Sequence, residues 1–316
     1  MFKTIVAIAG LLILANLNAQ AEQLATRNVK AKTMTLPDAI EYVRPSVIQM
    51  TMMLDNFSGS AVAAFGGKLF VAFPLGTGFL VNEDGYVVTA LHVVRAFQAY
   101  QVEGRKRLLV GVAAPNSENI RGNFAQIEFD IVEEDAGHDL VLLKLKRNPF
   151  KGEIGIFMKT GDKSIEWPHK AVILSRGRPR DGEIIAVSGY PLSSTVLITT
   201  SGNLASSWSY ELAEVQIPGA PAWFRFPDIA DSYLADVHVN GGNSGGPVYA
   251  VENGRVIGVC VAFDMSPVIY GDGNHEPASA GNRPLSYNSG LSVVVPIRYV
   301  IDLLKKHDLK WAEAAS

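Results

Sequence analysis

Short apolar runs rich in valine, isoleucine and leucine recur along most of the chain, separated by glycine, asparagine and aspartate. Such runs, bounded by turn-forming residues, are typical of β-strands. The pattern predicts strands at 46–52, 78–81, 86–89, 140–143, 171–174, 184–188, 196–200, 233–239, 248–251, 255–262 and 291–295. We therefore expect an all-β protein.

Helical patterns occur near the two ends of this strand-rich region. Residues 36–44 predict a short helix that Pro45 ends. Residues 297–307 predict a closing helix with Leu303 and Leu304 on its apolar face.

Residues 242–247 (Gly-Asn-Ser-Gly-Gly-Pro) place one hydroxyl in a glycine-rich turn between two predicted strands. A serine nucleophile needs backbone N–H groups aimed at its oxyanion, and Gly242 and Ser244 can supply them. The segment also fits a plain hairpin and the G-x-S-x-G turn of α/β-hydrolases. The hydrolase fold needs a helix directly after the serine, whereas 248–251 predicts a strand, which argues against it.

Two further residues stand at the ends of predicted strands. His92 directly follows one strand, and Asp139 directly precedes another. A carboxylate near an imidazole can orient the ring and stabilise its charged form. Taken singly, His92 fits a packed or surface histidine, and Asp139 fits a turn residue. Asp130 and Asp135 compete with Asp139, but neither opens a continuous apolar strand.

Together these segments resemble the trypsin-like serine proteases, most closely the bacterial HtrA/Deg branch. The motifs, in the family's order, are Gly-Thr-Gly-Phe at 76–79, Asp-Gly-Tyr at 84–86, Thr-Ala-Leu-His at 89–92, Asp-Leu-Val-Leu-Leu-Lys at 139–144 and Gly-Asn-Ser-Gly-Gly-Pro at 242–247. Further matches at 189–192, 200–202 and 290–296 extend the resemblance over about residues 36–306.

The resemblance implies two six-stranded Greek-key β-barrels with a short C-terminal helix and the active site in the cleft between the barrels. We expect the first barrel at about 46–147, the second at about 170–296 and the closing helix at 297–307. All three belong to one protease domain, 36–316.

The resemblance also implies the catalytic roles. His92 is the general base, Asp139 is its orienting partner and Ser244 is the nucleophile. The backbone N–H groups of Gly242 and Ser244 form the oxyanion hole.

The first substrate pocket is harder to read from the sequence. Family likeness places its wall near Val259, Cys260 and Val261 and in the segment before the serine. These apolar side chains predict small to medium aliphatic residues before the cut. His238 in that segment would favour an acidic or polar residue if it lay at the pocket base, but strand alternation can equally aim it elsewhere.

The chain departs from the Deg pattern in two respects. The 47 positions from His92 to Asp139 and the 105 from Asp139 to Ser244 are long for a compact domain, which predicts loop insertions near 111–125 and 207–230. The sequence also ends soon after the closing helix, so we expect no PDZ domain.

The N-terminal residues predict export. A basic start, an apolar core at 5–17 and Ala19-Gln20-Ala21 are typical of a signal peptide at 1–21, followed by a polar arm at 22–35. We expect a periplasmic or secreted protein with no stable membrane insertion after cleavage. An uncleaved anchor is the alternative.

Composition and charge limit the kinds of partner, cofactor and cross-link that we expect. The single cysteine excludes an intrachain disulfide, and the net charge of −3 argues against a nucleic-acid surface. Scattered histidines without paired Cys/His spacing predict no metal site, and we expect no cofactor. Protein or peptide substrates are the expected partners, and a homo-oligomer is left open.

The sequence thus predicts a serine endopeptidase that cleaves exported or misfolded proteins by a Ser-His-Asp acyl-enzyme mechanism. The alternative is a catalytically silent binding or scaffold protein with a protease fold.

Overall fold

A computed structural model describes residues 33–55, 63–65, 68–100, 106–113, 125–148, 156–157, 170–212, 229–267 and 286–312. The predicted signal segment and most of the polar arm lie outside these residues, as do parts of both predicted loop insertions. Within the described part of the chain, no helix is long and apolar enough to cross a membrane.

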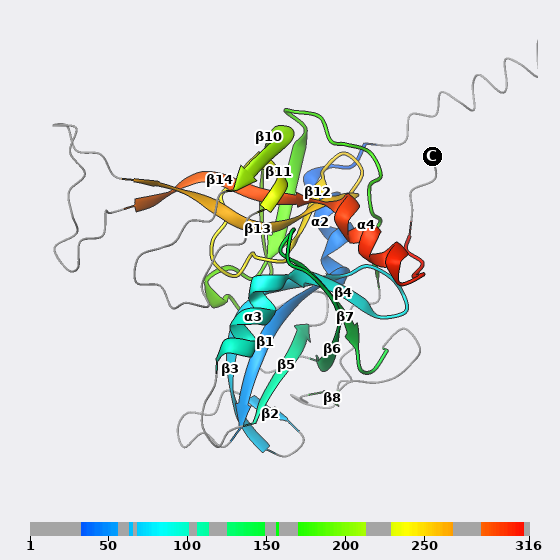
Figure 1. Ribbon diagram of the computed structural model, residues 1–316, viewed down its shortest axis with the longest axis vertical. Helices are drawn as coiled ribbons and strands as arrows, with labels where there is room; N and C mark the ends of the chain where they lie inside the picture. The colour runs from blue at the N-terminus through cyan, green and yellow to red at the C-terminus, as the bar shows by residue number, and fades with distance from the viewer. Residues whose placement is uncertain are drawn as a thin grey trace, which may run out of the picture.

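The first barrel consists of six antiparallel strands and occupies the lower half of Figure 1. Its strands are β1 (Val47–Asp55), β3 (Lys68–Leu80), β4 (Tyr86–Ala90), β5 (Arg107–Ala113), β6 (Ala125–Asp135) and β7 (Leu140–Leu145). They follow the order β1-β5-β6-β7-β4-β3, and the pairing of β1 with β3 closes the ring. Two short strands, β2 (Ala63–Phe65) and β8 (Ile156–Phe157), pair with β3 and β6.

The second barrel is also closed and antiparallel. Its strands are β9 (Ile184–Gly189), β10 (Ile198–Leu212), β11 (Ile229–Asp236), β12 (Pro247–Ala250), β13 (Val256–Pro267) and β14 (Ser286–Pro296). They follow the order β10-β11-β14-β13-β12-β9. The ends of β13 and β14 extend together away from the barrel as a two-stranded ribbon (Figure 1). The two-barrel prediction is confirmed.

Short helices accompany the barrels. They are α2 (Leu36–Val43), the 3₁₀ turn η1 (Arg44–Ser46), α3 (Leu91–Ala99), the 3₁₀ turn η4 (Pro191–Ser193) and α4 (Ile297–Lys306). A capping box between Thr35 and Asp38 starts α2, because each residue's side chain binds the other's backbone N–H. The closing helix α4 directly follows β14 and lies near β7 of the first barrel (Figure 1).

Three local predictions differ from the structure. Helix α3 begins one residue before His92, whereas the sequence analysis predicted only a strand end there. Leu91, Val93 and Val94 are buried on one face of this helix, so packing on the first barrel favours it. No strand was predicted within 54–69, which contains β2 and the start of β3. The strand predicted at 171–174 is absent, and only Leu174 forms an isolated bridge, to Val256.

One buried apolar cluster joins the two barrels. It contains Phe79 and Leu142 of the first barrel together with Val259 and Val295 of the second. Burying such surface stabilises by about 25 cal/mol per Å² of apolar area. The barrels are therefore held together by a shared core, and side chains from both can form one site.

Candidate active site

Asp139 and His92 form a tight pair on the first barrel. Asp139 ends the turn between β6 and β7, and His92 is the second residue of α3. The Asp139 Oδ2 atom lies 2.6 Å from His92 Nδ1, and Oδ1 accepts the backbone N–H of His92 at 2.9 Å. The backbone carbonyl of Asp139 also accepts the N–H of Leu91 at 2.8 Å. The predicted contact of His92 with Asp139 is thus present, with both carboxylate oxygens engaged.

The environment of His92 favours its charged form. Burial by itself lowers the pKa of the ring, but the charge of Asp139 and its hydrogen bond raise the pKa by more, and the net result is a raised value. Asp139 is 2% exposed, whereas 28% of the His92 side chain is exposed. In the neutral ring, Nδ1–H donates to the carboxylate and leaves Nε2 as a free base.

Ser244 lies on a glycine-rich turn of the second barrel. The N–H of Asn243 donates to the carbonyl of Asn240 at 3.0 Å, and Gly242 in this turn has a φ of +104°. A Cβ atom on Gly242 would lie 2.4 Å from the carbonyl oxygen of Tyr190, so a larger residue would clash. Glycine is needed here both for its positive φ and for the close approach.

The turn is anchored to β13. The N–H of Gly245 donates to the carbonyl of Cys260 at 2.7 Å, and the N–H of Cys260 donates to the carbonyl of Gly246 at 2.9 Å. The backbone of Cys260 therefore holds the residues directly after Ser244.

The serine turn contacts the segment that carries His92. The N–H of Thr77 on β3 donates to the carbonyl of Ser244 at 2.9 Å. Gly76 lies between the two, because a Cβ there would be 2.6 Å from the side chain of Val93 and 2.9 Å from the Ser244 carbonyl. A Cβ on Gly245 would lie 2.7 Å from the backbone nitrogen of Ala90. Residues next to Ser244 and residues next to His92 are thus in contact across the barrel interface.

Two backbone N–H groups at the serine turn are available to bind an anion. The carbonyl of Gly241 accepts the N–H of Leu192 at 2.7 Å. Across a trans peptide the N–H points opposite to the carbonyl, so the N–H of Gly242 points away from Leu192. Within the described ranges, the N–H groups of Gly242 and Ser244 and the Ser244 hydroxyl have no hydrogen-bond partner.

Thr77 and Leu192 support this turn, and the sequence analysis assigned no role to either. The Thr77 hydroxyl donates to the carbonyl of Gly242 at 2.7 Å and accepts the N–H of Tyr190 at 3.0 Å. Leu192 has a φ of +53° and is 76% exposed beside the turn. The signal that could have found Thr77 is its place between two glycines in the 76–79 motif.

The predicted pocket residues differ in exposure. Val259, Cys260 and Val261 each expose at most 1% of their surface, whereas His238 is exposed. Burial raises the pKa of the Cys260 thiol to about 12, so the sulfur stays protonated. The assignment of these four residues to the substrate pocket stays a prediction.

The competing acidic residues have other partners. Asp135 lies 2.8 Å from a nitrogen of His138, and Asp130 lies 3.8 Å from Lys146. In the part of the chain that the structure describes, no group of three or more histidine, cysteine or acidic residues is placed to hold a metal ion.

The chain forms two closed six-stranded antiparallel barrels, and a histidine–aspartate pair on one lies near a serine turn on the other. This arrangement defines the class of two-barrel, chymotrypsin-like proteins. Residues 76–259, more than half of the chain, match the family model of the trypsin-like peptidase domain. The chain therefore belongs to the trypsin-like peptidase family.

Individual relatives agree with this assignment. The chain is 25% identical to serine protease HTRA1 of Xenopus tropicalis over 226 residues, which cover 71% of this chain and 37% of the relative. It is 24% identical to a probable periplasmic serine endoprotease, DegP-like, of Rickettsia conorii over 238 residues, covering 74% of this chain and 34% of the relative. The matched region thus spans a little over one third of these relatives.

A solved structure supports the fold. The HtrA-type protease AlgW, determined with a decapeptide, matches 86% of this chain and 67% of its own, with a TM-score of 0.50 and 16% sequence identity.

Proposed function

We propose that this protein is a serine endopeptidase that hydrolyses peptide bonds through an acyl-enzyme. The observation that carries the proposal is that residues next to Ser244 contact residues next to His92, which brings the Asp139–His92 pair close to the serine turn. Two backbone N–H groups of that turn have no partner among the described residues. A nucleophile, a base with an orienting acid, and anion-binding donors are the parts that acyl transfer needs.

The chemistry follows from these parts. His92 Nε2 takes the proton of the Ser244 hydroxyl while the oxygen attacks the substrate carbonyl, and Asp139 keeps the other ring nitrogen protonated. The N–H groups of Gly242 and Ser244 donate to the resulting oxyanion. The charged His92 then gives its proton to the leaving amine. A water molecule, activated by the same ring, releases the acyl group and regenerates the serine.

We further propose that the substrates are exported or misfolded proteins and that the chain itself is exported. The names of the relatives, serine protease and periplasmic serine endoprotease, support this. The solved relative that was determined with a decapeptide supports peptide substrates. The aliphatic preference before the cut belongs to the same proposal.

Labelling with an alkyl fluorophosphonate tests the chemistry. We expect the folded wild-type chain to be labelled at Ser244 and the Ser244→Ala variant to remain unlabelled. Lys305→Ala, which removes an exposed ion pair on α4, serves as a matched control and keeps wild-type labelling. An unlabelled wild-type chain with a native circular dichroism spectrum would contradict the proposal.

A silent binding protein is the second candidate, because the Ser244 hydroxyl has no hydrogen bond to His92 in the structure. Such bonds are often long before substrate binds, so the observation does not exclude catalysis. Mapping the cleavage sites in denatured proteins separates the two. Cuts after small aliphatic residues would support the protease and its expected preference. Abundant cuts after glutamate would support a protease in which His238, not an aliphatic pocket, sets the preference. The absence of any cut would favour the binding protein.

A further inference from the structure

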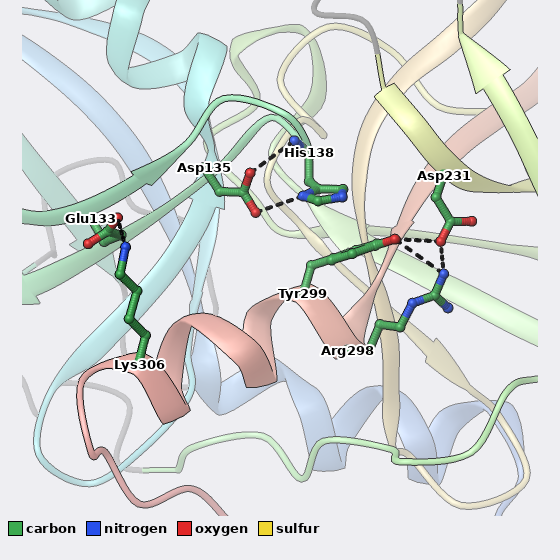
Figure 2. Close-up of polar contacts among 7 residues, drawn as sticks. All are labelled: Glu133, Asp135, His138, Asp231, Arg298, Tyr299 and Lys306. Carbon is green, nitrogen blue, oxygen red and sulfur yellow. Dashed lines mark hydrogen bonds and ion pairs between the residues drawn. The ribbon is translucent and has the colours of Figure 1, made fainter.

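The residue before Asp139 makes a contact of its own with the closing helix. The ring of His138 stacks on Tyr299 of α4, with 3.5 Å between the ring centroids and 20° between the planes. Its Nδ1 atom lies 2.8 Å from Oδ2 of Asp135, and its backbone N–H donates to Oδ1 of the same carboxylate at 3.2 Å. Figure 2 shows His138 between Asp135 and the Tyr299 ring. The side chain is thus held on two sides, although nothing in the proposed chemistry uses it.

Tyr299 is in turn anchored to the second barrel. Its hydroxyl donates to Oδ2 of Asp231 on β11 at 2.6 Å, and Arg298 forms an ion pair with the same carboxylate (Figure 2). The guanidinium of Arg298 also lies 4.8 Å from the centre of the Tyr299 ring. Asp231 is only 17% exposed, so this bond is better protected from solvent than a surface contact. The ring of Tyr299 therefore has one orientation, which is set by β11.

The other end of α4 is attached to the same hairpin of the first barrel. Lys306 forms an ion pair of 2.7 Å with Glu133 on β6, and the Nε2 atom of His307 lies 3.1 Å from the other oxygen of Glu133. Glu133 is two residues before Asp135. The helix thus contacts the β6–β7 hairpin at two places and joins it to the second barrel.

The backbone of Asp139 gives a reason for such support. Asp139 has a φ of +52°, a left-handed conformation that residues other than glycine seldom adopt. Such conformations persist where the surrounding structure determines them strongly. The described hydrogen bonds of Asp139 all go to Leu91 and His92 on its own barrel, and the residue next to it, His138, is the one that stacks on Tyr299 of α4.

We infer that His138 and Tyr299 are positioning residues, whose stacked rings fix the turn that carries Asp139 and so set the strength of its contact with His92. Their effect on hydrolysis rests on the proposed function, whereas their effect on His92 does not. Through the stack, contacts of Tyr299 with the second barrel fix the position of the histidine–aspartate pair on the first barrel.

The titration of His92, followed by NMR of its ring protons, measures the strength of the contact between Asp139 and His92 and does not require enzymatic activity. Tyr299→Leu removes the stack, and we expect it to lower the pKa of His92 by about half a pH unit or more, because the carboxylate is held less closely. We expect kcat for peptide hydrolysis to fall about tenfold while KM is unchanged. Tyr299→Phe keeps the stack and loses only the hydrogen bonds of the hydroxyl with Asp231 and Arg298, so its effects should be smaller.

His138→Gln gives an independent test that removes the stack but leaves Tyr299 and its bond to Asp231 in place. It tests the inference if Tyr299→Leu fails to fold. We expect the same fall in the pKa of His92. The double variant should show no larger change than either single variant, because both remove one shared contact. Lys305→Ala, on the same helix, should leave the titration at the wild-type value.

An unchanged His92 titration in the folded variants would overturn the inference, as would fully additive effects in the double variant. Loss of kcat without a change in the titration would show a merely structural role and count against it. If wild-type Ser244 is not labelled by fluorophosphonate, the proposed function fails, yet the His92 titration still decides whether His138 and Tyr299 position Asp139.

Discussion

Asp139 binds both the ring and the backbone of His92, with Oδ2 2.6 Å from Nδ1 and Oδ1 2.9 Å from the peptide nitrogen. One side chain thereby sets the position of the histidine, the rotation of its ring and which nitrogen carries the proton. In the proposed mechanism the free nitrogen, Nε2, acts on Ser244. Activity and stability should therefore depend on this pair and on the nearby serine turn.

Replacing Asp139 by asparagine should abolish most of the activity without unfolding the protein. The amide can donate to Nδ1, which stabilises the wrong tautomer and leaves Nε2 protonated. We expect kcat to fall by about 10⁴-fold, measured on a peptide substrate. Asp130→Asn is the control, since that carboxylate is 66% exposed and contacts Lys146. A fall of less than tenfold for Asp139→Asn would contradict the assigned role.

The raised pKa of His92 predicts the pH dependence of activity. The ring accepts the serine proton only when it is neutral, so kcat/KM should rise with pH and reach half its maximum above 6.5, the ordinary histidine value. A pH–rate profile of the wild-type chain measures this midpoint. A midpoint below 6.5 would mean that burial, not Asp139, controls the ring.

The raised pKa of His92 also predicts how the free energy of unfolding depends on pH. A group whose pKa is raised on folding stabilises the native state fully below its unfolded value, here about 6.5. This stabilisation is lost as the pH rises through the folded pKa. We expect the difference in unfolding free energy between wild type and Asp139→Asn to be larger near pH 5 than at pH 9. Urea unfolding at both pH values measures it, and an increase toward high pH would contradict the sign.

Gly242→Ala should impair the oxyanion site. The added Cβ would lie 2.4 Å from the Tyr190 carbonyl, at a φ of +104°, so the turn must move and carry its N–H group with it. Losing one such donor lowers kcat by about 10²- to 10³-fold. Gly241→Ala is the matched control, because a Cβ there meets nothing within 4 Å. Equal losses in the two variants would argue against an oxyanion role for Gly242.

Thr77→Val should weaken both stability and activity. Valine has nearly the same shape but leaves the N–H of Tyr190 without a partner and frees the carbonyl of Gly242. A buried unpaired group costs about 1–3 kcal/mol of unfolding free energy. Thr77→Ser keeps the hydroxyl and should retain most of both properties. Denaturant unfolding and kcat of the two variants measure the difference, and equal behaviour of serine and valine would show that the hydrogen bonds do not matter.

Much of the fold could be predicted because its signals are local. Runs of β-branched residues predicted most of the strands. The glycine-rich serine turn was recognisable from its composition, and the structure shows positive φ at Gly242 and Gly245, which glycine adopts without strain. Helix α3 was missed, since its short apolar pattern directly continues that of β4 and only packing on the barrel separates the two.

The sequence by itself determined which residues stand at the strand ends and in the serine turn, because each motif contains its own turn chemistry. Only the tertiary structure decided that Thr77 supports Gly242 across 165 positions, that Cys260 is buried, and that Tyr299 stacks on His138. These contacts join residues far apart in the chain. They arise from the closure and docking of two barrels, which no local pattern of residues encodes.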